Sequence, residues 1–285
     1  MNILELKHFF LTELDGCYPK KEIISFFHLL IQHKLQLTKI EVALHPTKAL
    51  DAKTISFFKN AISELKAEKP IQYIIGSTEF YGLNFCVNEN VLIPRPETEE
   101  LVDWIIKDSQ NTTLNILDIG TGSGCIGISL AKNLSNAKVY AVDISKKALE
   151  IAQQNAKHNN IAIQFIEQDM LKSNVVLNTE KNIQFDIIVS NPPYVRELEK
   201  VEIKKNVLTY EPHTALFVKD NKPLLFYEAI ANFAKANLKK NGTLYVEVNQ
   251  YLGKETHKLL QVKGFTQTKL SKDLFGNDRM IKASF

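Results

Sequence analysis

The sequence predicts an α/β protein, in which a doubly wound, mostly parallel sheet follows a small all-helical domain joined to it by a β-hairpin. Residues 1–70 carry apolar residues at helical spacing, without the alternation of a strand. Residues 71–93 alternate aromatic and β-branched residues around two glycines, as hairpins do. Residues 94–285 repeat the pattern strand, turn, helix, which implies parallel strands covered by helices. We therefore expect a helical domain, a hairpin linker and an α/β domain with these boundaries.

Length and composition fit a folded, water-soluble protein. Of 285 residues, 45% are hydrophobic and 24% are charged, close to the averages for globular proteins. The first residues lack the basic and apolar regions of a secretory signal, and no stretch approaches the ~18 apolar residues of a membrane span. The 3 cysteines have no CxxC spacing, which argues against a disulfide framework or a zinc site. We expect a cytoplasmic protein with no metal and no membrane partner.

Charge disfavours direct binding to nucleic acid. The net charge is +3, and residues 1–90 balance 10 lysines against 10 acidic residues. Nucleic-acid-binding proteins usually show a concentrated basic face instead. Arginine occurs only at Arg95, Arg196 and Arg279. Because its planar fork of donors cannot be copied by lysine, these positions indicate sites where lysine would not serve, unless their placement is chance.

The helical part is expected to hold four or five helices. Leu6 and Phe10 illustrate the spacing in the first of them, Phe27 in a second and Phe58 in a later one. The stretches "YPKKE" and "LHPTK" mark breaks, because proline fixes its own φ and restricts the residue before it.

The hairpin is expected to span "IQYIIGSTEFYGLNFCVNENVLIP", with Gly76 and Gly82 inside it. It ends at Pro94-Arg95-Pro96, where two prolines hold the backbone extended. Arg95 would then project from a rigid strut, although a stiff interdomain linker is an equally simple explanation.

The α/β domain is expected to contain five strands followed by a two-stranded finish. The five strands are residues 114–120, 137–143, 161–167, 185–190 and 242–248. Helices are expected at 126–134, 146–158 and 224–238. The segments "FTQTKLS" and "DRMIKASF", joined by the turn "KDLFGN", would form an antiparallel edge on the parallel sheet.

A glycine-rich loop follows the first of these strands. Gly120, Gly122, Gly124 and Gly127 open the next helix, where backbone N–H groups approach a ligand closely. Asp143 ends the next strand, and an acid at that position accepts hydrogen bonds from two ribose hydroxyls. Together these residues predict a site for an adenosine-containing cofactor.

The glycines alone leave the cofactor open, because Gly122 to Gly127 also fits the G-x-G-x-x-G pattern of nicotinamide enzymes. S-Adenosylmethionine carries an ammonium group, which would make Asp118 useful, although Asp118 is as readily a hydrogen-bonding acid at a strand end. After the third strand, Asp169 is placed to accept from an adenine amino group and Met170 to cover the ring. The simpler alternatives are that Asp169 is an ordinary acid in a loop and that Met170 is a methionine at the edge of the core.

The fourth strand runs into Asn191-Pro192-Pro193-Tyr194, again at the carboxyl edge where ligands bind. The two prolines stiffen the turn and remove two donors, which leaves the Pro192 carbonyl and the Asn191 amide oxygen as fixed acceptors. Tyr194 offers an aromatic face for a planar group. A planar NH₂ group matches this arrangement, so the turn predicts methyl transfer to nitrogen. Asn-Pro is also an ordinary turn signal, and only its position after the glycine loop and Asp143 favours catalysis.

The chain resembles the release factor glutamine methyltransferase family, also called PrmC or HemK. The stretches that carry the resemblance include "LIPRPETEELV", "ILDIGTGSGCIGISLA", "IVSNPPYV", "YEPHTALF" and "FGNDRM", and they span nearly the whole chain. The resemblance implies a Rossmann-like class I methyltransferase domain that uses S-adenosyl-L-methionine. It also implies that the methyl group goes to the side-chain nitrogen (N5) of the glutamine in the Gly-Gly-Gln motif of peptide chain release factors.

The resemblance also implies particular site residues. Cofactor contacts fall at Gly120, Thr121, Gly122, Ser123, Gly124, Asp143, Met170 and Asn191, and the target glutamine at Asn191, Pro192, Pro193 and Tyr194. The helical domain would help to hold the release factor. Two features depart from the family's pattern: position 170, often a larger aromatic residue, is Met170, and the loop in "VKDNKPLLFYEA", which touches no proposed catalytic group, lacks the usual Asp-Gly.

Two other substrates remain open. A ribosomal protein glutamine would need the same chemistry, and a DNA or RNA base amine would have to be flipped into the pocket. The flanking motifs favour the release factor, and the neutral first 90 residues disfavour a nucleic acid.

Overall fold

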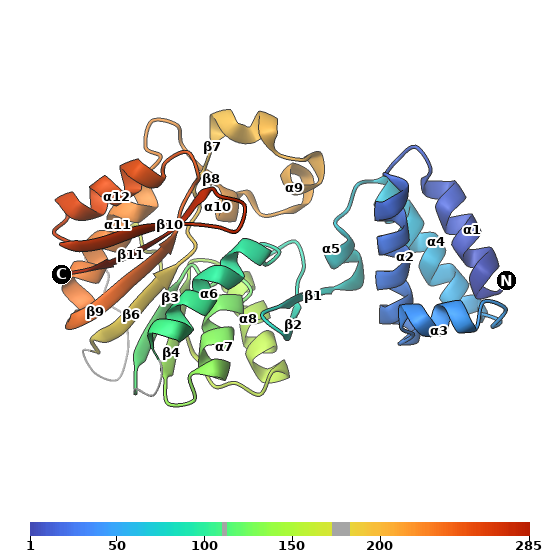
Figure 1. The fold of residues 1–285 in the computed structure, drawn as a ribbon, viewed down its shortest axis with the longest axis horizontal. Coiled ribbons are helices and arrows are strands. Elements are labelled where there is room, and N and C mark those ends of the chain that lie inside the picture. Colours follow the sequence, from blue (N-terminus) through green and yellow to red (C-terminus); the bar gives the residue numbers. More distant parts are fainter. Residues whose placement is uncertain (110–112, 173–182) are drawn as a thin grey trace. The chain divides into compact units, whose positions relative to one another are not determined.

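The structure is a computed structural model that describes residues 1–109, 113–172 and 183–285 (Figure 1). It divides into two compact units. Unit 1 comprises Met1–Gly76 together with Lys204–Tyr210, and unit 2 comprises Ser77–Ile203 together with Glu211–Phe285. The expected hairpin lies in unit 2, and a short segment from the second half of the chain belongs to unit 1.

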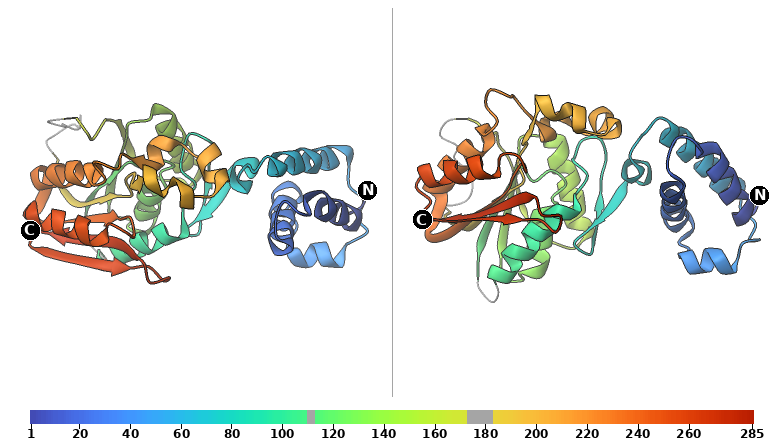
Figure 2. Two further views of the ribbon diagram at one scale, coloured as in Figure 1. Left: turned by 90° about the horizontal axis from the view of Figure 1, so that it is seen from above. Right: turned by 45° about the horizontal axis from the view of Figure 1, so that its top comes forward.

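Unit 1 is a bundle of helices, seen from two further directions in Figure 2. The helices are α1 (Ile3–Leu14), α2 (Lys20–Leu35), α3 (Lys39–Leu44), α4 (Ala52–Lys66), α5 (Ile71–Ile75) and α9 (Lys205–Tyr210). The breaks fall where the prolines predict them, because Pro19 precedes α2 and α3 ends before His45-Pro46. Asn2 caps α1 through a reciprocal box with Glu5, which satisfies backbone donors at the helix start.

The core of unit 1 is built on three phenylalanines. Phe10, Phe27 and Phe58 are fully buried, and their ring centroids lie 5.7, 5.9 and 6.1 Å apart in tilted and edge-on pairs. Each such pair adds ~0.5–1.5 kcal/mol to what burial of the rings contributes. The helical spacing read from the sequence therefore corresponds to one apolar core.

Helix α9 is attached to the end of α4 by polar contacts. The Tyr210 hydroxyl donates to the carbonyl of Ala67 at 2.8 Å, and Lys205 lies 3.3 Å from the carboxylate of Glu68. None of the residues of α9 is buried. Since exposed polar contacts contribute little each, this attachment is weak in energy.

Unit 2 is built on a seven-stranded sheet of order β10-β11-β9-β6-β3-β4-β5. The strands are β3 (Asn115–Ile119), β4 (Lys138–Asp143), β5 (Gln164–Glu167), β6 (Phe185–Ser190), β9 (Leu238–Glu247), β10 (Gln267–Lys272) and β11 (Asp278–Ser284). The first five run parallel, whereas β10 and β11 form an antiparallel finish next to β9. The doubly wound sheet and its antiparallel edge are confirmed.

Alternate residues of each strand enter different cores, because successive side chains point to opposite faces of a sheet. Ile116 packs with α6 (Pro96–Asp108), α7 (Cys125–Asn133) and α8 (Lys146–His158), whereas Leu117 packs on the face covered by α11 (Leu225–Asn237) and α12 (Gly253–Val262). Figure 1 shows one layer of helices on each face of the sheet. The predicted helices after the first two strands and before β9 are confirmed.

The expectation that the hairpin begins at residue 71 is wrong for residues 71–75. These residues form α5, which ends at Gly76 in the left-handed conformation, with the Gly76 N–H donating to the carbonyl of Gln72. Glycine adopts that conformation without steric cost, so it ends a helix as readily as it shapes a hairpin. The hairpin itself begins one residue later, as β1 (Ser77–Phe80) and β2 (Leu83–Cys86) around Tyr81-Gly82.

Helix α6 was not expected after the two prolines. Arg95 is extended as predicted, with φ −100° and ψ 142°, but Pro96 is the first residue of the helix. Proline suits that position because the N–H it lacks has no partner within a helix there. Several short elements were also not foreseen: β7 (Val195–Arg196), the 3₁₀ helix η1 (Glu197–Glu202), α10 (His213–Leu216), β8 (Phe217–Val218) and the longer α12. Within the described ranges, no helix has both the length and the apolar character needed to cross a membrane.

Candidate active site

The carboxyl ends of the parallel strands meet at one edge of the sheet of unit 2. The glycine loop follows β3, Asp143 ends β4, Asp169 and Met170 follow β5, and Asn191 follows β6. In open parallel sheets this edge is where ligands bind. The topology therefore brings the residues singled out in the sequence to a common edge.

The backbone of the glycine loop is arranged to leave open space above it. Gly120 and Gly122 have φ of +71° and +55°, and a Cβ added to either would meet no atom within 4 Å. The Gly120 and Thr121 N–H groups donate to the carbonyl of Val142 at 2.8 and 3.0 Å. Thr121 and Ser123 are buried, and the Thr121 carbonyl accepts from the Gly124 N–H at 2.8 Å. The open surface fits close approach of a bound cofactor.

Asp143 holds the glycine loop against the end of β4. Its Oδ2 accepts from the Gly122 N–H at 2.9 Å, and its Oδ1 accepts from the Ser145 N–H at 2.8 Å. Burial raises the pKa of the Asp143 carboxyl, and these backbone hydrogen bonds oppose that rise. Each carboxylate oxygen has a second lone pair, so the group retains acceptor capacity for two hydroxyls. A ribose diol fits what the residue can still accept.

Asp118 lies beneath the loop and is fully buried. Its Oδ2 accepts from the Thr121 hydroxyl at 2.6 Å and from the Gly127 N–H at 3.0 Å, which ties β3 to the start of α7. Its Oδ1 has no hydrogen-bond partner in the part of the chain that the structure describes. Burial raises the pKa of Asp118 to about 6. The structure assigns it a supporting contact, and a role toward an ammonium group stays a hypothesis.

Asp118 is expected to make the stability of the cofactor-free protein depend on pH. Its pKa rises from 3.8 when the chain is unfolded to about 6 when it is folded. The folded state therefore binds the proton more tightly, and this contribution to stability is present below about pH 4 and lost as pH rises through about 6. Asp118→Asn has no such proton. Between pH 4 and 7 its free energy of unfolding should gain about 2 to 3 kcal/mol relative to wild type. Urea unfolding of both proteins at several pH values measures this, and parallel curves would contradict it.

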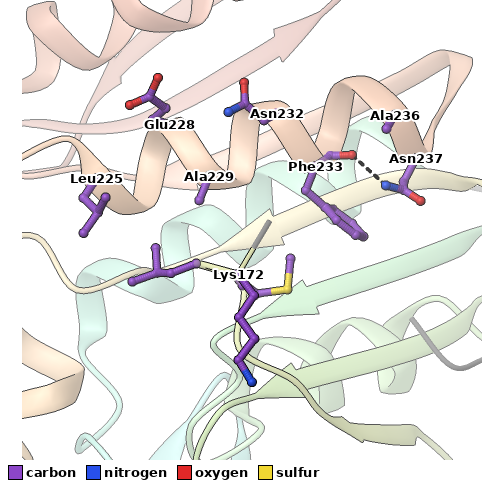
Figure 3. A pocket seen from close by; sticks show the side chains of 10 residues that line it. Lys172, Leu225, Glu228, Ala229, Asn232, Phe233, Ala236 and Asn237 are labelled. Atoms are coloured by element: carbon purple, nitrogen blue, oxygen red, sulfur yellow. Dashed lines mark hydrogen bonds between the residues drawn. The ribbon is translucent and has the colours of Figure 1, made fainter. Parts of the chain in front are cut away.

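Asp169 and Met170 are half-buried, and the Asp169 carboxylate accepts from the Leu171 N–H at 2.9 Å. Met170 packs against the core beneath α11, and it lines a pocket there (Figure 3). The other lining residues are Leu171, Lys172, Leu225, Glu228, Ala229, Asn232, Phe233, Ala236 and Asn237. This pocket includes only one of the expected cofactor residues, so the adenine contacts of Asp169 and Met170 stay predictions.

The turn after β6 is held from both ends. The Nδ2 group of half-buried Asn191 donates to the Thr98 hydroxyl at 3.2 Å, and Pro192 is buried. The Tyr194 hydroxyl donates to Glu247 Oε1 at 3.0 Å, and the backbone carbonyl of Tyr194 accepts from Asn249 Nδ2 at 2.9 Å. Burial and the nearby Glu247 carboxylate raise the pKa of Tyr194 well above its ordinary value. Tyr194 is thus a neutral, anchored ring.

The acceptor oxygen of Asn191 remains available. No hydrogen bond to its Oδ1 is formed by any residue in 1–109, 113–172 or 183–285. Since its Nδ2 is engaged with Thr98, Oδ1 is the atom left to receive a donor. This agrees with the expected acceptor role, while stacking on the Tyr194 face stays a prediction.

Three of the residues around this turn were missed in the sequence: Thr98 on α6, and Glu247 and Asn249 at the end of β9. Thr98 donates to Glu247 Oε2 at 2.6 Å, and Asn249 also donates to Glu199 at 2.8 Å. Burial raises the pKa of Glu247, against the hydrogen bonds from Thr98 and Tyr194 and the charge of Arg279. The sequence signal for Glu247 and Asn249 is the same as for the other site residues: both are polar and lie at the carboxyl end of a parallel strand, β9, where ligands bind.

Each arginine forms an ion pair with a buried carboxylate. The pairs are Arg95 with Glu211 at 2.6 Å, Arg196 with Glu199 at 2.6 Å, and Arg279 with Asp273 at 3.1 Å. Glu211, Glu199 and Asp273 are all buried. A fork of fixed donors suits such acids better than a flexible ammonium, which is a physical reason for arginine at these positions.

Comparisons with known proteins show where the chain belongs. Two family models match it, the methyltransferase small domain over residues 98–214 and the PrmC N-terminal domain over residues 21–76. A release factor glutamine methyltransferase of Flavobacterium psychrophilum is 55% identical over 97% of this chain and 96% of its own length. The chain belongs to the release factor glutamine methyltransferase family. A second member, from Bacteroides thetaiotaomicron, is 42% identical over 95% of this chain and 96% of its own length.

A solved structure supports the fold of this family member. The 16S rRNA N2 methyltransferase of Thermus thermophilus, in complex with AdoMet and guanosine, aligns with a TM-score of 0.52 and 18% identity, over 73% of this chain and 50% of that one. At that identity the likeness concerns the fold alone. The expected class I methyltransferase domain with a helical N-terminal domain is confirmed, and so is the identity of the chain as a methyltransferase.

Proposed function

We propose that the protein transfers a methyl group from S-adenosyl-L-methionine to the side-chain nitrogen (N5) of the glutamine in the Gly-Gly-Gln motif of peptide chain release factors. The observation that carries this proposal is the unengaged Oδ1 of Asn191, which lies at the same sheet edge as the glycine loop and Asp143. Membership of the release factor glutamine methyltransferase family supports the choice of substrate.

The cofactor would be held by the glycine loop and by acids at the strand ends. The loop from Gly120 to Gly124 would lie against the cofactor, with open space at Gly120 and Gly122, Asp143 would accept from the ribose hydroxyls, and Asp169 and Met170 would contact the adenine. Bound there, S-adenosyl-L-methionine supplies a methyl group on a positively charged sulfur. The chain's own contribution is to bind and orient the two reactants, which accounts for much of the rate in such a reaction.

Two acceptors in the turn would orient the substrate amide. The Oδ1 of Asn191 and the carbonyl of Pro192 would accept hydrogen bonds from its two N–H groups, and Pro193 and Tyr194 would form the border of the site. As the amide nitrogen gains positive charge in the transition state, these hydrogen bonds strengthen, so the turn binds the transition state better than the ground state. The methylated nitrogen is acidic and loses its proton to water, so no side chain is assigned as a general base.

The partner is expected to be a protein in the compartment where translation takes place, the cytoplasm. We propose that the helices of unit 1 help to hold the release factor, and that neither nucleic acid nor membrane is a direct partner. Unit 1 carries 12 lysines and 8 acidic residues, a net charge of +4, which is a small excess compared with the concentrated basic face of a nucleic-acid-binding protein.

A transfer assay with labelled S-adenosyl-L-methionine tests this function. A purified release factor should gain one methyl group per chain, and the same factor with its motif glutamine replaced by alanine should gain none. A release factor with a different, exposed glutamine replaced serves as the matched control and should be labelled fully. Equal labelling of the motif variant, or preferential labelling of ribosomal protein, DNA or RNA in parallel reactions, would contradict the proposal.

A further inference from the structure

We propose that Thr98 and Glu247 are positioning residues that determine which way the amide of Asn191 faces. The inference rests on the proposed function for its consequence in catalysis, but the geometry on which it depends is that of this chain alone. It assigns a role to a threonine on α6 and a glutamate on β9, neither of which is itself expected to touch the substrate.

The direction of each hydrogen bond follows from the groups involved. Thr98 has one hydroxyl proton, and it lies 2.6 Å from Glu247 Oε2, which as a carboxylate can only accept. The Thr98 oxygen, 3.2 Å from the amide of Asn191, must therefore accept, and only the NH₂ end of that amide donates. The order Asn191 to Thr98 to Glu247 thus admits one orientation of the amide.

The orientation matters because the two ends of an asparagine amide have nearly the same shape and opposite polarity. With Nδ2 held by Thr98, Oδ1 is left to accept from a substrate N–H. A flipped amide would present its own donors to the NH₂ group of the substrate, and neither hydrogen bond would form. The flip would cost the site an acceptor without displacing the turn.

Burial keeps water from taking over these contacts. Thr98 is 2% exposed and Glu247 is 1% exposed. Inside such a region an alternative partner is scarce, so the network stays in one arrangement. The second oxygen of Glu247 accepts from Tyr194, and both carboxylate oxygens are therefore committed to donors.

Glu247 is itself fixed by the sheet. Glu247 pairs with Met280 of β11 in the sheet, and the backbone carbonyl of Glu247 accepts from the Tyr227 hydroxyl of α11 at 3.1 Å. The position from which the amide of Asn191 is oriented is thus part of the rigid core of unit 2 rather than of a loop.

Paired substitutions at Thr98 test the role. Thr98→Val keeps the shape and removes the hydroxyl, whereas Thr98→Ser keeps the hydroxyl. For Thr98→Val, kcat for the release factor should fall about 10- to 100-fold, with the Kd of S-adenosyl-L-methionine within about twofold of wild type. Thr98→Ser should stay within about threefold of wild-type kcat. The matched control is Thr256→Val on α12, since Thr256 is equally buried and its hydroxyl has no partner in the described residues.

A second measurement does not depend on the substrate. In the cofactor-free, ¹⁵N-labelled protein, the side-chain NH₂ of Asn191, assigned by its loss in Asn191→Ala, should exchange hydrogen about tenfold or more faster in Thr98→Val than in wild type or Thr98→Ser. Equal exchange in all three proteins would overturn the inference, as would wild-type kcat in Thr98→Val or an equal loss in Thr98→Ser. Failure of the wild-type enzyme to label any release factor would instead overturn the proposed function. The exchange measurement would still test whether Thr98 holds the amide of Asn191.

Discussion

Asn191→Ala is expected to lower methyl transfer to the release factor about a thousandfold, the loss typical of removing a hydrogen-bonding group that acts in the transition state. The variant loses the one side-chain acceptor that the turn offers, because Nδ2 is directed to Thr98 and Oδ1 is otherwise unengaged. Single-turnover rates at saturating cofactor measure the effect. Binding of S-adenosyl-L-methionine, followed by calorimetry, should change by less than about tenfold, because the other expected contacts remain.

Asn237→Ala is the matched control for this prediction. Asn237 is also half-buried and its side chain makes one hydrogen bond, from Nδ2 to the carbonyl of Phe233 at 2.9 Å. It ends α11 directly before β9, at the amino edge of the sheet, and the pocket that it lines together with Met170 does not include Asn191. Its replacement should leave the rate unchanged. An Asn191→Ala enzyme that retained a tenth of wild-type turnover would exclude the two-acceptor mechanism.

Asp143→Ala is expected to weaken binding of S-adenosyl-L-methionine by about two to three orders of magnitude. Hydrogen bonds to a charged acceptor contribute about 1.5–3 kcal/mol each, and two ribose hydroxyls would lose such an acceptor. The Gly122 and Ser145 N–H groups lose their partner as well, so the loop is less well ordered for the cofactor. Calorimetric titration of the cofactor gives the Kd directly.

Asp186→Ala separates this effect from general loss of a strand acid. Asp186 also accepts from a backbone N–H, that of Asn115 at 2.8 Å, and from Lys239 at 2.7 Å, but it lies at the start of β6. Its replacement should leave the Kd within about threefold of wild type. If the two variants bound the cofactor equally well, the ribose assignment of Asp143 would be wrong.

Most of the fold could be predicted because its signals are local. The alternation that places Ile116 and Leu117 on opposite faces of β3 is visible within a few residues, and so is the helical spacing that leads to the core of Phe10, Phe27 and Phe58. The errors occurred where a local signal has two outcomes. Gly76 ends a helix with the same left-handed conformation that a hairpin would use, and Pro96 starts a helix although it stiffens the strut before it.

The candidate site divides in the same way. The glycine loop, Asp143 and the turn at Asn191 were determined by the sequence alone, because glycine, proline and a strand-end acid act on their immediate neighbours and the strand order follows from the α/β pattern. The orientation of the Asn191 amide was decided only by the tertiary structure. Its partner Thr98 is 93 residues away in the chain, and Glu247 is 149 residues from Thr98. A hydrogen bond acts over about 3 Å, so contacts between such distant residues exist only once α6, β6 and β9 have packed together.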